Sequence, residues 1–143
     1  MIIVTSISPG HANKEHQELA VASWCGNGPC ISLNAPNEVI EGYNSIVVMP
    51  THRTIQHFVG KPLVTINAMI DMAKEMDGDL MLINSDIILT DLPMFKEDGV
   101  TIMSRYDFDT KELFPYGFDV FYIPKKFLNI FPPAIYAMGV AFW

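Results

Sequence analysis

Short apolar runs rich in β-branched residues alternate along the chain with helical or turn-rich segments, and this alternation constrains the fold more than any other feature. The runs predict strands over residues 1–7, 30–34, 45–49, 80–89, 100–104 and 118–123. The spacing of apolar residues predicts one helix capped by Asn13 that reaches about Trp24, a second from Pro62 to Asp77, and a short third over 125–131. Because the runs are nearly continuously apolar, they are typical of a parallel sheet that helices bury on both faces. We therefore expect an α/β domain with three layers, α/β/α, and a mostly parallel central sheet.

The length and composition fit a single domain over residues 1–143. Half of the residues are hydrophobic (50%), which allows a substantial core, and the chain has no internal repeat or linker. Sixteen acidic residues against nine basic ones give a formal net charge of −7, which disfavours a surface that binds polyanions, so nucleic acid is not an expected partner. No apolar run approaches the ~20 residues that span a bilayer, and the N-terminus lacks the basic start of a signal peptide. We expect a cytoplasmic protein without a transmembrane segment.

Two further features bear on the compartment and the assembly. Cys25 and Cys30 are too few and too isolated to indicate a disulfide framework or a zinc knuckle, so we expect reduced thiols. The apolar run over residues 138–143 looks like the start of a strand, which suggests a C-terminally truncated domain. An unfinished sheet edge there could pair with a second copy, so a homodimer is a possible assembly.

Polar side chains gather where the expected strands end, which is the edge at which open α/β sheets bind ligands. The run over 80–89 contains Asn84, Ser85 and Asp86 between apolar residues. An ionised carboxylate among leucines and isoleucines is expected to have a partner, which could be a helix N-terminus, a basic side chain or a metal ion. Asp86 could equally cap the turn that follows it. Neither a GxGxxG motif after the first strand nor a P-loop is present, so the ordinary dinucleotide and P-loop sites are not expected.

Histidines and a second pair of carboxylates are further candidates for metal ligands. His11 and His16 are five residues apart, as are His52 and His57, and this spacing does not place either pair on one helical face. We therefore expect surface or loop histidines. The two aspartates at 107 and 109 could bind a cation, but a polar loop explains them equally well.

The order of the segments resembles the GT-A type of nucleotide-diphospho-sugar transferases over nearly the whole chain. The resemblance is carried by "IIVTSISP", "ISLN" with Glu38 four residues on, "GKPLVTINAMIDMA", "LMLINSDIIL", "GFDVFYIPKKF" and "MGVAFW". The segment "NSDI" stands where that fold carries its DxD motif. Asp86 takes the place of the last aspartate of the motif, and Asn84 replaces the first.

The resemblance implies roles for individual residues. Asp86 would bind Mn²⁺ or Mg²⁺, which holds the donor diphosphate and stabilises the departing nucleotide. Asp119, in "GFD", is the candidate catalytic base that faces the acceptor. The candidates for nucleotide binding are Ser6, Asn34, Glu38, Arg53, Asn84, Ser85 and Arg105. A turn explains Asn34 at least as well as a contact with the base.

The resemblance therefore implies a metal-dependent glycosyltransferase. It would move a sugar from a nucleotide-diphospho-sugar donor to an acceptor that the sequence does not identify. A positioned cation lowers the barrier because negative charge develops on the leaving nucleotide. The alternatives are a catalytically inactive nucleotide-binding domain and an interaction domain of the same fold.

Overall fold

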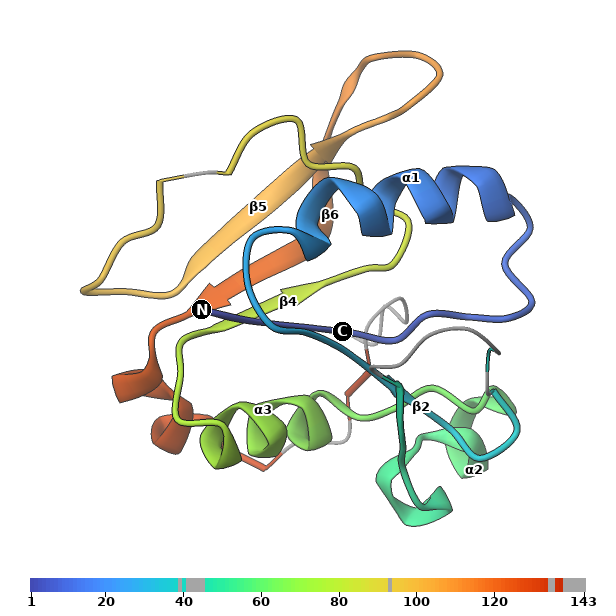
Figure 1. The fold of residues 1–143 in the computed structure, drawn as a ribbon, viewed down its shortest axis with the longest axis vertical. Coiled ribbons are helices and arrows are strands. Elements are labelled where there is room, and N and C mark those ends of the chain that lie inside the picture. Colours follow the sequence, from blue (N-terminus) through green and yellow to red (C-terminus); the bar gives the residue numbers. More distant parts are fainter. Residues whose placement is uncertain (39, 41–45, 93, 134–135, 138–143) are drawn as a thin grey trace.

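The computed structural model of the chain describes residues 1–38, 40, 46–92, 94–133 and 136–137. Six strands form one mixed sheet with the order β3–β2–β1–β4–β6–β5 (Figure 1). The strands are β1 (Ile2–Thr5), β2 (Cys30–Asn34), β3 (Ile46–Val48), β4 (Leu80–Ile83), β5 (Thr101–Tyr106) and β6 (Leu113–Ile123). β1 pairs in parallel with β2 and β4, and β2 pairs in parallel with β3, whereas β6 is antiparallel to both β4 and β5.

The expected α/β class is confirmed, but the sheet is only partly parallel, which corrects the expectation of a mostly parallel one. Residues 107–112 join β5 to β6, and this connection is too short for a parallel crossover. The two strands are therefore a hairpin and run in opposite directions. β6 lies between β4 and β5 and is also antiparallel to β4. It therefore runs against the four parallel strands β1 to β4.

Two of the helices begin at a side-chain cap. The helices are α1 (Lys14–Cys25), α2 (Gln56–Val59) and α3 (Ile66–Glu75), with 3-10 helices η1 (Thr51–Arg53) and η2 (Lys125–Ile130). The Asn13 side chain accepts a hydrogen bond from the backbone N–H of His16 at 3.0 Å, which confirms the predicted cap of α1. The helix expected from Pro62 begins only at Ile66. The cause is Thr65, whose extended backbone and hydroxyl, which accepts from Ala68 N, make it the N-cap.

The core has two parts, one on each face of the sheet. Alternate residues of a strand point to opposite faces, so a central strand can contribute to both parts. One part packs Val4 and Leu82 with Met69 of α3, and the other packs Ile3 with Trp24 of α1. Figure 1 shows α1 and α3 on opposite sides of the sheet. The expected layering of helices on both faces is therefore confirmed.

β4 is shorter than the expected strand over 80–89. It ends at Ile83, and the next residues form a turn in which the backbone N–H of Ile87 donates to the carbonyl of Asn84 at 3.2 Å. The apolar residues 87–89 therefore do not extend the strand. They lie against α1 instead, where Trp24 and Ser23 form hydrogen bonds with the backbone of residues 87 and 89.

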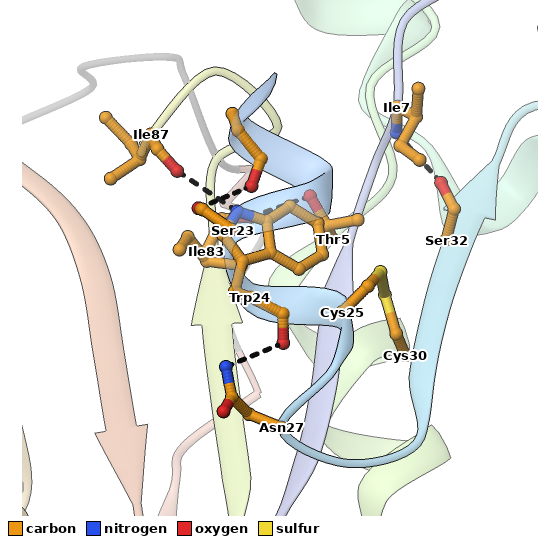
Figure 2. The surroundings of a disulfide bond; sticks show 11 residues. Thr5, Ile7, Ser23, Trp24, Cys25, Asn27, Cys30, Ser32, Ile83 and Ile87 are labelled. Atoms are coloured by element: carbon orange, nitrogen blue, oxygen red, sulfur yellow. Dashed lines mark hydrogen bonds between the residues drawn. A yellow bond between two sulfur atoms is a disulfide. The ribbon is translucent and has the colours of Figure 1, made fainter. Parts of the chain in front are cut away.

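A disulfide joins Cys25, the last residue of α1, to Cys30, the first residue of β2 (Figure 2). This pairing corrects the expectation of reduced thiols. The residues between them, Gly26 to Pro29, fold back tightly, so the two Cα atoms are 5.4 Å apart and within the usual range for a disulfide.

Two further expectations concern the apolar run over 138–143 and the absence of a transmembrane segment. The apolar run over 138–143, with its expected free edge, lies outside the described residues. Within the described ranges, no helix has the length and apolar character needed to cross a membrane.

Candidate functional site

Asp119 of β6 lies at the centre of a polar cluster that joins β4, β5 and β6. Its side chain is only 8% exposed. Asn84, directly after β4, donates from Nδ2 to Asp119 Oδ1 at 2.5 Å, and Arg105 of β5 donates from Nη1 to Oδ2 at 2.5 Å. The structure thus brings together three residues that the sequence singled out separately. We call them the Asp119 cluster.

The geometry of β5 and β6 aims Arg105 at this carboxylate. The pairing of the two strands shifts register between Met103 and Arg105, and such irregularities re-aim side chains. The Arg105 guanidinium also lies over the ring of Phe114, 5.1 Å from its centroid. Gly117 permits this approach, since a Cβ there would stand 2.5 Å from Phe114 Cδ1 and 3.2 Å from Asp119 Oδ2.

The chemistry available to the cluster follows from these contacts. Asp119 is buried, and each of its oxygens already accepts one hydrogen bond. Arg105 is 42% exposed and keeps donors free for a ligand, because a guanidinium has five N–H groups. The arrangement therefore suits Asp119 to hold Arg105 in a fixed orientation toward an anion.

Asp86 lies in the turn two residues after Asn84, and its side chain is 46% exposed. The His11 ring, from the loop between β1 and α1, places Nε2 at 3.6 Å from Asp86 Oδ2. Of the partners that the sequence left open for Asp86, the structure provides a basic side chain. The exposed half of the carboxylate remains accessible to a ligand or a cation.

Helix α1 holds the turn that carries Asp86. Ser85 is buried, and its hydroxyl accepts a hydrogen bond from Gln17 Nε2 at 2.8 Å. Further along, Trp24 Nε1 donates to the carbonyl of Ile87 at 3.0 Å (Figure 2). The hydroxyl of Ser23 accepts from the backbone N–H of Leu89 at 2.9 Å. Ser85 is therefore engaged inside the protein, and its contacts favour a supporting role over direct binding of a nucleotide.

Asn34, at the end of β2, is fully buried and is used by the fold. Its Nδ2 donates to the carbonyls of Ile7 and Glu38, both at 2.6 Å, and its Oδ1 accepts from Ser32 Oγ at 2.5 Å. These bonds tie the loop after β1 to the loop after β2, in agreement with the turn interpretation of Asn34. Ser6 and Glu38 lie beside this junction and are partly exposed. Burial raises the pKa of the Glu38 carboxyl above its ordinary value.

Arg53 belongs to a different part of the surface. Its Nη2 lies 2.6 Å from Oδ2 of Asp71 in α3, and both residues line an open cavity of about 510 Å³. Arg53 follows β3 at one edge of the sheet, and Arg105 belongs to β5 at the other. Five strand spacings separate these edges, or about 24 Å. The structure therefore does not bring Arg53 together with the Asp119 cluster.

The described residues gather no group of three or more histidine, cysteine, aspartate or glutamate side chains around one point. A cation at Asp86 would thus take most of its ligands from phosphate oxygens and water, as Mg²⁺ commonly does in phosphate-binding sites.

Asp107 has a local role, because its Oδ1 accepts from the backbone N–H groups of Asp109 and Thr110. The bonds from Thr110 are the main cause of the lowered pKa of Asp107. The Asp107 side chain therefore shapes the β5–β6 turn.

Comparisons of the chain with protein-family models, with curated proteins and with solved structures found no match. The fold and the contacts of the site are therefore the basis for assigning a function. These define an α/β protein with a mixed sheet. At the carboxyl end of its β4 strand, Asn84 contacts the Asp119 carboxylate that holds the Arg105 guanidinium, and the half-exposed carboxylate of Asp86 lies two residues after Asn84.

Proposed function

We propose that this chain is a GT-A type domain that binds a nucleotide-diphospho-sugar together with a divalent cation and transfers the sugar to an acceptor hydroxyl. The observation that carries the proposal is the link between the Asp119 cluster and the turn of Asp86 through Asn84. A diphosphate is a dianion that needs at least two positive groups. The Arg105 guanidinium and a cation on Asp86 would supply them at one edge of the sheet.

Each residue then has a defined role. Asp86 would hold the cation, which neutralises the charge that develops on the leaving nucleotide. Arg105 would bind a phosphate oxygen, and Asp119 with Asn84 would keep its guanidinium in place. Ser6 and Glu38, at the exit of β1 and β2, are the candidates for the ribose and base.

Catalysis by Asp119 as the base stays a prediction. A base must reach the acceptor hydroxyl directly or through one water. Asp119 is buried and already accepts bonds from Asn84 and Arg105. This observation favours a second candidate function, a domain that binds the nucleotide without turning it over.

The test is a thermal-shift screen of UDP, GDP, CDP and their sugars, each with and without Mn²⁺. A ligand at 100 times its dissociation constant stabilises the native state by about 2.7 kcal/mol, which for a chain of this length raises the melting temperature by about 9 °C. We expect a shift that requires Mn²⁺ and one nucleotide, is lost in Asp86→Ala and is kept in the control Asp91→Ala, which changes an exposed loop aspartate.

The outcomes separate the two candidates. Binding together with release of the nucleoside diphosphate in the presence of acceptors supports a transferase, whereas binding without release supports the binding-only domain. If no nucleotide shifts a protein that melts cooperatively, both are wrong.

A further inference from the structure

His11 and Asp86 come from different loops, and their side chains face one another. The distance from His11 Nε2 to Asp86 Oδ2 is 3.6 Å, which is too long for a hydrogen bond. Two ligands that bind one cation at ~2.1 Å stand about 3.0 Å apart at an octahedral angle and about 3.4 Å apart at a tetrahedral one. The two atoms therefore need to approach by only about 0.2 to 0.6 Å to share a cation.

The ring of His11 contacts Asn13, the N-cap of α1, through Nδ1. Its Nδ1 lies 2.9 Å from the carbonyl oxygen of Asn13 and 3.1 Å from the backbone N–H of the same residue, which donates to Nδ1 in the tautomer that has its proton on Nε2. A cation bound at Nε2 would select the other tautomer, in which Nδ1–H donates to the carbonyl of Asn13. This tautomer leaves the lone pair of Nε2 directed at Asp86. A histidine that binds a metal usually donates its other N–H in this way.

Both candidate ligands are anchored to the same helix. Asn13 is fixed because its side chain caps α1 by accepting from His16 N, and its carbonyl accepts from Gln17 N at 3.2 Å. The side chain of Gln17 in turn binds Ser85, the neighbour of Asp86. One helix therefore sets the spacing between the two ligand atoms, as a preorganised site requires.

We propose that His11 Nε2 and Asp86 together bind the divalent cation, and that the nitrogen ligand selects Mn²⁺ over Mg²⁺. Carboxylate and phosphate oxygens serve both ions, whereas imidazole favours transition metals. The proposal rests on the proposed function only in assigning the remaining ligands to diphosphate and water. Binding of Mn²⁺ to the two side chains can be measured without any nucleotide.

The experiment is electron paramagnetic resonance of Mn²⁺ bound to the full chain, first alone and then with UDP. Echo modulation from ¹⁴N reports a directly bound imidazole. We expect this modulation in the wild type and in the control His16→Ala, and its loss in His11→Ala. Since positioning groups behind a ligand already cost about 10- to 100-fold in metal affinity, loss of the ligand itself should weaken Mn²⁺ binding at least as much. Mg²⁺ affinity should change far less.

The outcomes distinguish this inference from the proposed function. Bound Mn²⁺ without ¹⁴N modulation, or modulation that persists in His11→Ala, overturns the role of His11 even if UDP binds. If Mn²⁺ binds neither alone nor with UDP, the role of His11 is overturned as well. Modulation that is lost in His11→Ala while no nucleotide binds supports the cation site and contradicts the transferase proposal. Because His11 lies in a surface loop, His11→Asn provides a second variant that keeps a polar side chain on the loop.

Discussion

Replacing Cys25 and Cys30 together by serine should lower the free energy of unfolding by about 2 kcal/mol at 25 °C, because the disulfide closes a loop in the unfolded chain. The two residues are five apart, so the closed loop contains six residues. The entropy that such a small loop removes from the unfolded state corresponds to about 2 kcal/mol at 25 °C. The serines keep the shape of the site, so the loss of cross-linking dominates.

Differential scanning calorimetry provides the measurement. A chain of 143 residues unfolds with an entropy of about 300 cal/mol/K, so the loss of about 2 kcal/mol lowers the melting temperature by about 7 °C. Wild-type protein in a phosphine reductant should melt close to the double serine variant. The variant itself should not respond to the reductant, which makes it the matched control.

A count of thiols decides the case independently. Denatured wild-type protein that has not met a reductant should contain no thiol that reacts with Ellman's reagent, and reduction should expose both. Two reactive thiols before reduction, or equal melting temperatures with and without reductant, would refute the reasoning.

Three further predictions concern single contacts. Burial, aided by the hydrogen bond to Asp79, raises the pKa of Tyr122 to about 12, above its ordinary 10.0, so its contribution to stability is complete below pH 10 and is lost as the pH rises to 12. Absorbance at 295 nm should show one late tyrosine that disappears in Tyr122→Phe, and a single uniform titration would contradict this. A double-mutant cycle of Gln17→Ala and Ser85→Ala should give a coupling of about 1 kcal/mol in urea unfolding, whereas additive losses would show that the bond contributes nothing. Asp119→Ala should cost about 2 kcal/mol by the same assay, because it removes a charged acceptor from two donors, and an unchanged midpoint would contradict the buried ion pair.

Local patterns sufficed to predict much of the fold. The cap at Asn13 and the apolar runs of β1 and β2 lie where local propensity and tertiary packing agree. The run over 80–89 misled because its second half is apolar for a different reason: it packs against α1, where Trp24 binds the carbonyl of Ile87. The reversed direction of β6 could not be predicted, since it depends on the short connection over 107–112 and on β6 lying between β4 and β5.

The candidate site was predicted in part. Asn84, Arg105 and Asp119 are each recognisable in the sequence, but their contact exists only because three strands meet in one order. Gln17 was missed, although a signal exists: it occupies the buried face of α1, three residues before an alanine and seven before Trp24. Nothing in the spacing of His11 points to Asp86, because their contact joins two loops.

The place of β1 in the sheet has a consequence for how the chain acquires its structure. β1 is a central strand, and its hydrogen bond from Thr5 Oγ1 to the carbonyl of Ile83 joins residues 78 positions apart. Contacts of such separation slow folding, since a long loop must close before they form. During synthesis from the N-terminus, β1 would have β2 as its first neighbour and would present its other edge until β4 is complete. β1 therefore keeps an unpaired apolar edge that is open to association with other nascent chains until β4 forms, and a burst of protection there in pulsed hydrogen exchange should coincide with the formation of β4.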